Sequence, residues 1–76
     1  MIKDELEQLI LKNGRVEFKL YSLEYTIEFV DNQFVIYANS YKEKKSTYDS
    51  LKELLNNYTV YNESIMDNID RVSILE

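Results

Sequence analysis

The sequence contains no cysteine, no histidine and no proline, and Gly14 is its single glycine. Without cysteine there is no disulfide and no thiolate metal site, so packing alone must hold the fold together. Without histidine the chain also lacks the usual general base and a common metal ligand. Asp67 and Asp70 lie three residues apart, but such a pair is more typical of solvated charge and capping than of a metal site. We therefore expect no enzymatic activity, no catalytic residue and no cofactor.

The remaining composition is that of one small folded domain covering residues 1–76. The chain is 45% hydrophobic and 30% charged, with a formal net charge of −5. This negative charge disfavours general binding to nucleic acid or to an anionic membrane surface. No apolar run approaches the roughly 20 residues that span a bilayer, and the N-terminus lacks the pattern of a secretory signal. We predict a cytoplasmic protein, which the absence of cysteine also suits.

Residues 2–13 have the pattern of an amphipathic helix, because apolar side chains recur at helical spacing and make one stripe. The members of this stripe are Ile2, Leu6, Leu9 and Ile10. Gly14 follows directly, at the position where helices commonly end in a residue of left-handed conformation. The sequence thus uses its one glycine to end a helix.

The next three segments alternate with a period of two, which indicates half-buried strands. Their inward residues are Val16, Phe18 and Leu20, then Tyr25, Ile27 and Phe29, then Phe34, Ile36 and Ala38. A first hairpin turning at Ser22–Leu23 is predicted to pair Phe18 with Ile27. The same register places Glu17 opposite Glu28, which is mildly destabilising.

A second hairpin, turning at Asp31–Asn32, is predicted to pair Ile27 with Ile36. Aspartate and asparagine tolerate positive φ, as tight hairpin turns require. A fourth, shorter strand is expected at residues 44–48. Two registers remain open for it, with either Ser46 and Tyr48 or Lys45 and Thr47 facing inward.

A second helix is predicted to begin near Ser50, because residues 50–53 read Ser-Leu-Lys-Glu and match the capping box. Asn56–Asn57 is expected to end it. The apolar stripe of this helix comprises Leu51, Leu54, Leu55 and Tyr58.

The C-terminal part is predicted to form short elements. Residues 59–61 are expected to be extended and Asn62–Glu63 to form a turn. Ser64 is predicted to cap a third helix over residues 65–70, and residues 72–74 alternate as a short edge strand would. The expected fold is therefore α+β, with an N-terminal helix, a three- to four-stranded antiparallel meander sheet, and two C-terminal helices packed on one face. An edge formed by the first or the last strand offers a route to a homodimer.

Tyrosine is the most informative excess in the chain, with seven occurrences. If helices cover one face of the sheet, the other face carries a partly apolar patch. Tyrosine is favoured at protein interfaces because it offers a large contact area with few rotors. The predicted contacts to a protein partner are Tyr21, Thr26, Val35, Tyr37 and Tyr41. The alternative interpretation is a set of scattered surface aromatics, which need no partner.

A basic group, Lys42, Lys44 and Lys45, lies close to Tyr41 and Tyr48. Lysines interleaved with aromatic rings can hold single-stranded nucleic acid by charge and stacking. The alternative interpretation is a solvated turn, or charges that protect a sheet edge from unwanted pairing.

A short hairpin is followed by an aromatic strand, a serine-capped helix with two leucines at residues 50–55, and a second serine-capped segment at residues 64–69. With this order, the stretch from Tyr21 to Ile74 resembles a type of small uncharacterised protein from low-GC Gram-positive bacteria and their prophages. The resemblance implies a cytoplasmic accessory protein and no site residues. We predict a non-enzymatic protein-binding module, of the kind with which a phage or mobile element inhibits or modulates a host or defence protein. The alternative is a small nucleic-acid-binding accessory protein that uses Lys42–Lys45.

Overall fold

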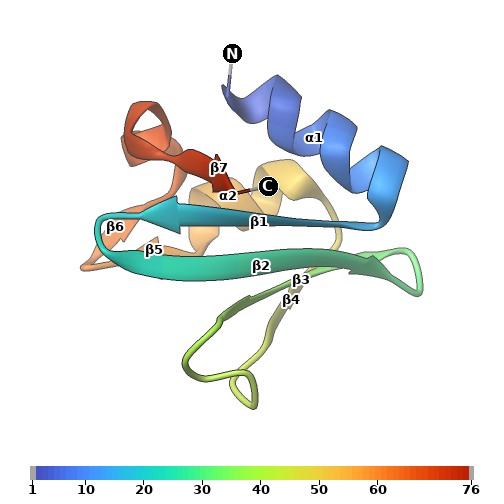
Figure 1. Ribbon diagram of the computed structural model, residues 1–76. Coiled ribbons are helices and arrows are strands. Elements are labelled where there is room, and N and C mark those ends of the chain that lie inside the picture. The colour runs from blue at the N-terminus through green and yellow to red at the C-terminus, as the bar shows by residue number, and fades with distance from the viewer. Residues whose placement is uncertain (1, 76) are drawn as a thin grey trace.

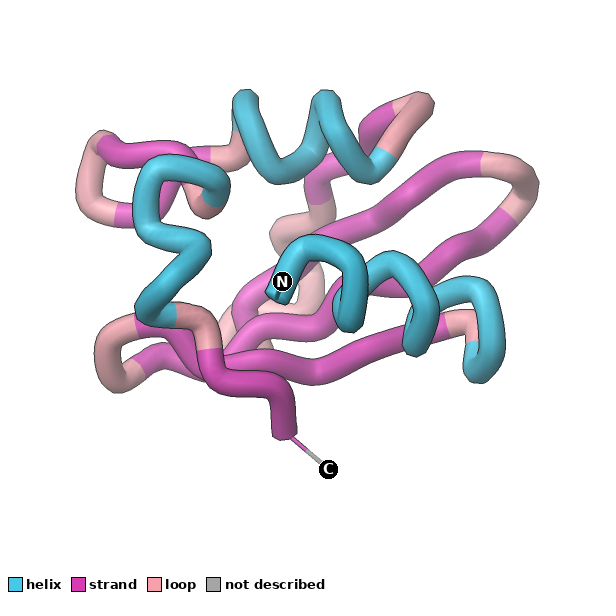
Figure 2. The backbone as a smooth tube through the Cα atoms, turned by 90° about the horizontal axis from the view of Figure 1, so that it is seen from above, coloured by secondary structure: helices cyan, strands magenta, loops and turns pink. Residues whose placement is uncertain are grey.

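The computed structural model describes residues 2–75 of the chain. It has a five-stranded antiparallel sheet, in the order β4-β3-β2-β1-β7, and a separate two-stranded sheet of β5 and β6. Its elements are α1 (Ile2–Asn13), β1 (Arg15–Leu20), β2 (Leu23–Val30), β3 (Gln33–Ala38), β4 (Ser46–Tyr48), α2 (Leu51–Asn57), β5 (Thr59–Val60), β6 (Glu63–Ser64), the 3₁₀ segment η1 (Met66–Arg71) and β7 (Ser73–Leu75). Figures 1 and 2 show α1 and α2 on the same side of the main sheet. The predicted α+β class is confirmed, and the main sheet consists of the four meander strands and the C-terminal edge strand.

The helix α1 has the predicted bounds and ends as predicted at Gly14. The Gly14 amide donates a hydrogen bond to the Ile10 carbonyl at 2.8 Å, and Gly14 has φ +80°. Glycine adopts this left-handed conformation without steric cost. The Gly14 carbonyl accepts a hydrogen bond from the Phe29 amide at 2.9 Å, so the end of the helix is also tied to the sheet.

The first hairpin differs from the prediction. Its turn lies at Tyr21–Ser22 and not at Ser22–Leu23, so Phe18 faces Tyr25 instead of Ile27. The side-chain period of a strand is two, and the register moves by two residues, so the same face of each strand is still turned to the core. Phe29, predicted to face inward, is the exception, because it is 38% exposed. The leucines on either side of the turn, Leu20 and Leu23, face each other.

The corrected register also removes the predicted opposition of Glu17 and Glu28. Glu17 faces Thr26, and Glu28 faces Arg15. The Arg15 guanidinium instead forms an ion pair with Glu17 along the same strand. The outer face of the sheet therefore places opposite charges, and not like charges, next to each other.

The second hairpin has the predicted register, with Ile27 opposite Ile36. Asp31 and Asn32 have φ values of 52° and 64°, as a type I′ turn requires. Strong alternation on both strands and turn residues that accept positive φ agree on one register, which explains why this hairpin is predictable.

The fourth strand is shorter than predicted and resolves the open register. Tyr48 lies opposite Phe34, and Ser46 lies opposite Ile36. Ser46 and Tyr48 therefore face inward, together with the apolar residues of β3.

The predicted pair of C-terminal helices is wrong in its second member. The first, α2, begins as predicted, and the Ser50 hydroxyl accepts a hydrogen bond from the Glu53 amide at 3.1 Å. The second is the 3₁₀ segment η1, which Asn68 interrupts with φ −120° and ψ 23°. The Ser64 hydroxyl accepts a hydrogen bond from the Asp67 amide at 3.1 Å. The predicted serine cap is therefore present, but no α-helix follows it.

A small hairpin, β5–β6, replaces the predicted extended stretch and turn. The turn is Tyr61–Asn62, one residue earlier than the predicted Asn62–Glu63, with φ values of 54° and 68°. This again is the φ pattern of a type I′ turn. The tyrosine occupies a position where sequence reasoning expects asparagine, aspartate or glycine, which explains the error.

The last strand, β7, confirms the expected edge strand and corrects the expected edges. It pairs with β1 and places Ile74 opposite Phe18. Along residues 17–19, β1 therefore pairs with β2 on one side and with β7 on the other. The outermost strands of the main sheet are β4 and β7.

The hydrophobic core lies between the main sheet and the helical layer. Strand residues of one parity meet the apolar stripes of α1 and α2, which is why the alternation and the helical spacing are both present in the sequence. The buried core comprises Leu6, Ile10, Val16, Phe18, Leu20, Tyr25, Ile27, Ile36, Leu51, Leu54, Leu55, Val60, Ile65 and Val72.

Candidate functional site

The predicted partner contacts do not form one exposed surface. Two of them lie on the outer face of the sheet but are covered: Thr26 is 1% exposed and Tyr37 is 8% exposed. The Thr26 hydroxyl donates a hydrogen bond to Asn39 Oδ1 at 2.6 Å, and Lys45 Nζ lies 5.2 Å from the centre of the Tyr37 ring. Residues of the connection between β3 and β4 therefore cover this part of the face. Neither Thr26 nor Tyr37 offers much contact area to a partner.

The other three predicted contacts lie in different places. Val35 is half-buried in β3. Tyr21 is 37% exposed in the turn between β1 and β2, and Tyr41 is 60% exposed in the connection between β3 and β4. The two exposed tyrosines thus belong to two separate candidate sites.

The first candidate site is a pair of aromatic rings from two hairpin turns, Tyr21 and Tyr61, which we call the tyrosine pair. Their ring centroids are 5.4 Å apart and the ring planes make an angle of 70°, an edge-to-face contact. The two turns lie side by side at the left of Figure 1. Tyr61, at 68% exposure, was missed by the sequence analysis. The available signal was a tyrosine directly before asparagine in a predicted turn.

Both members of the tyrosine pair have unusual backbone conformations. Tyr21 has φ 60° and Tyr61 has φ 54°. Positive φ is uncommon for residues other than glycine, asparagine and aspartate, and costs a bulky residue about 1–2 kcal/mol. Strained residues of this kind cluster at binding and active sites, where function outweighs the cost in stability.

The hydrogen bonds of Asn68 fix Tyr21 in place. The Tyr21 hydroxyl donates to Asn68 Oδ1 at 3.0 Å, and Asn68 is buried. Asn68 Nδ2 in turn donates to the Ser64 carbonyl at 3.2 Å and to Glu63 Oε2 at 3.3 Å. Tyr21 is thus a rigid support, and Tyr61, which is 68% exposed, packs against it.

The second candidate site lies in the connection between β3 and β4, which carries the predicted basic group Lys42, Lys44 and Lys45. A small pocket of about 260 Å³ opens there. Its lining residues are Ala38, Tyr41, Lys44 and Tyr58, which we call the loop site. Burial, and secondarily the neighbouring Tyr48, raises the pKa of the Tyr58 phenol, so Tyr58 is neutral at physiological pH. Two tyrosines and one lysine therefore line a single concavity.

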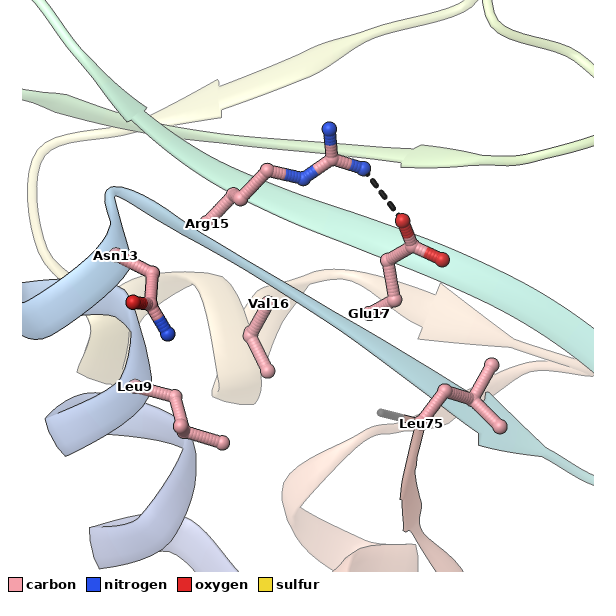
Figure 3. A pocket seen from close by; sticks show the side chains of 6 residues that line it. All are labelled: Leu9, Asn13, Arg15, Val16, Glu17 and Leu75. Carbon is pink, nitrogen blue, oxygen red and sulfur yellow. Dashed lines mark hydrogen bonds and ion pairs between the residues drawn. The ribbon is translucent and has the colours of Figure 1, made fainter.

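A larger groove of about 480 Å³ lies between α1, β1 and β7 (Figure 3). Its lining residues are Leu9, Asn13, Arg15, Val16, Glu17 and Leu75. The two charged groups form an ion pair with each other, as the dashed line in Figure 3 shows. The remaining walls are apolar apart from one amide, so this groove provides no acid, base or metal-binding set.

No further chemical site emerges from the described part of the chain. Within residues 2–75, the aspartate and glutamate side chains form no group of three that could hold a metal ion. Over the same residues, every helix is too short or too polar to cross a membrane. No protein-family model, curated protein or solved structure matches the chain. The tyrosine pair and the loop site are therefore the features from which a function must be argued.

Proposed function

We propose that this chain is a non-enzymatic protein-binding module whose contact surface is centred on the tyrosine pair. One observation carries the proposal: Tyr61 is 68% exposed and has φ 54°, at a turn position where asparagine or glycine would cost less. An exposed tyrosine gains little from burial in the free protein. Contact with a partner supplies the missing gain, because tyrosine is enriched among the residues that dominate binding energy.

The support beneath the exposed ring favours the same interpretation. Tyr21 is held by its hydrogen bond to the buried Asn68, and its ring meets Tyr61 edge to face. A rigid aromatic anchor loses little conformational entropy on binding, which raises affinity for a given contact area. The tyrosine pair is thus already in a conformation suited to binding.

The neighbouring charges define the chemistry of the partner. Glu63 and Arg71 both contact Asn68 beneath the tyrosine pair, and Asp67 lies in the same 3₁₀ turn. With a net charge of −5 on the whole chain, the favoured partner surface is neutral or basic. We place this interaction in the cytoplasm, where the module inhibits or modulates a host or defence protein on behalf of a phage or mobile element.

Affinity purification of the tagged protein from its native host tests this function. We expect a protein that co-purifies with the wild type and is lost with Tyr61→Asn. Asn32→Gly is the matched control, because it changes the corresponding kind of turn in the β2–β3 hairpin and should keep the partner. A purified complex reconstituted from the two proteins must show the same dependence on Tyr61. A partner retained equally by all three forms would place the contact surface elsewhere.

A further inference from the structure

The loop site has the features of a binding site for a small ligand. It shares no residue with the tyrosine pair. Its side chains come from the end of β3, from the β3–β4 connection and from the residue that follows α2. The pocket volume of about 260 Å³ is below the range of about 300–1,000 Å³ typical of sites for drug-sized ligands. A ligand of this site must therefore be smaller than a typical drug-sized molecule.

Two consecutive turns position the side chains of the loop site. The Tyr41 amide donates to the Ala38 carbonyl at 2.9 Å, and the Lys44 amide donates to the Tyr41 carbonyl at 3.0 Å. Each hydrogen bond spans three residues, as in a β-turn. Tyr41 and Lys44 thereby face the same concavity from successive turns.

Both ends of the connection are also attached to the sheet. At its start, the Asn39 amide donates to the Glu24 carbonyl at 2.9 Å, and Asn39 Oδ1 accepts the Thr26 hydroxyl. At its end, Lys45 lies over the Tyr37 ring. The loop site is therefore built on a connection that is fixed at both ends, which is the arrangement that makes binding geometry reproducible.

The charge of the connection is opposite to that of the whole protein. Lys42, Lys44 and Lys45 are accompanied there by one acidic residue, Glu43, while the chain as a whole carries −5. A local positive charge attracts a small anion. The surrounding negative charge repels a long polyanion such as duplex nucleic acid.

We propose that the loop site binds a single nucleobase together with its phosphate, as in a nucleoside monophosphate or the terminal nucleotide of a strand. Tyr41 provides the aromatic face on which the base stacks, because every base has a π-face that such a ring accepts. Lys44 contacts the phosphate. The neutral Tyr58 phenol forms a hydrogen bond with the base or the sugar.

Titration of the ¹⁵N-labelled protein with uridine monophosphate, followed by amide chemical shifts at low salt, tests this proposal. We expect saturable shifts at Ala38, Tyr41, Lys44 and Tyr58, with a millimolar or tighter dissociation constant. Stacking on an aromatic ring is worth about 1–3 kcal/mol per base, so Tyr41→Ala should weaken binding about fivefold or more. Lys44→Ala should weaken binding and reduce its dependence on salt. Parallel titrations with an oligothymidylate hexamer distinguish a free nucleotide from a strand terminus.

The matched controls are Lys19→Ala, which removes the same charge from the exposed face of β1, and Tyr61→Asn, which removes another exposed tyrosine. Both should leave the affinity for uridine monophosphate unchanged. Equal shifts with inorganic phosphate alone would overturn the proposal, because they would show that charge suffices. An unchanged affinity in Tyr41→Ala, or the absence of saturable shifts, would also overturn it. Failure of this site leaves the tyrosine pair untouched, since the two share no residue.

Discussion

The change Tyr61→Asn should stabilise the folded protein while it removes the proposed binding surface. Tyr61 has φ 54° and is followed by Asn62 at φ 68°, so it occupies the first central position of a type I′ turn. A bulky residue in this left-handed region costs about 1–2 kcal/mol, and asparagine tolerates the region far better. The substitution therefore relieves backbone strain.

The loss of the ring offsets part of this gain. The Tyr21–Tyr61 contact is edge to face at 5.4 Å, and such pairs contribute about 0.5–1.5 kcal/mol. Because Tyr61 is 68% exposed, we take the lower end of that range. The net effect is a gain of about 0.5 kcal/mol, which corresponds to a rise in Tm of about 2–4 °C for a domain of this size.

Thermal and urea denaturation followed by circular dichroism measure this effect. Tyr61→Phe is the control, because it keeps both the ring and the backbone strain and should have the stability of the wild type. A loss of more than about 1 kcal/mol in Tyr61→Asn would refute the reasoning. It would show that the exposed ring stabilises the fold and needs no partner to explain it.

Three further predictions concern stability. Asn32→Gly should raise the free energy of unfolding by about 0.5 kcal/mol, because glycine suits φ 64° at the second central position of the turn; an unchanged or lower urea midpoint would contradict this. Ser50→Ala should cost about 1 kcal/mol by removing the acceptor for the Glu53 amide, whereas Ser50→Asp should retain most of the stability in the same assay. Burial raises the pKa of Tyr25 and Tyr58 above the usual value of about 10, so the unfolded chain ionises first. The stability that these two groups contribute should be fully present below about pH 10 and be lost as the pH rises through the folded-state values, and a urea midpoint that does not fall over that range would contradict the assignment.

The parts of the fold that could be predicted are those where local signals agree. In α1, the apolar stripe and Gly14 indicate the same end, and the structure has it there. In the second hairpin, alternation on both strands and the Asp31–Asn32 turn require the same register. The Ser50 cap is also local, because it depends on a hydroxyl and an amide three residues apart.

The two turns were mispredicted because a residue in each adopts a backbone conformation that its residue type disfavours. Tyr21 and Tyr61 adopt positive φ, which turn chemistry assigns to glycine, asparagine or aspartate, and so both turns were placed one residue too late. The signal that reveals the tyrosine pair as a candidate site is therefore the same one that misled the prediction of the turns. Local sequence rules are expected to fail most often at functional or strained positions.

The predicted contact surface on the outer face of the sheet is covered by contacts that no local sequence pattern indicates. Thr26 and Tyr37 alternate as exposed strand residues should, yet Asn39 and Lys45 cover them from the β3–β4 connection. Such coverage depends on the path of a loop in three dimensions. Of the three lysines named for nucleic-acid contact, Lys44 lines the loop site, and the contribution of Tyr58 to it required the tertiary structure.

Site-specific photo-crosslinking in the native host tests the central claim most directly. A benzophenone amino acid replaces Tyr61 in one variant and Leu11, which is comparably exposed on α1, in the other. The tyrosine-pair proposal predicts that one protein crosslinks from position 61 and does not crosslink from position 11. The absence of a crosslink from position 61, or the same products from both positions, would contradict it.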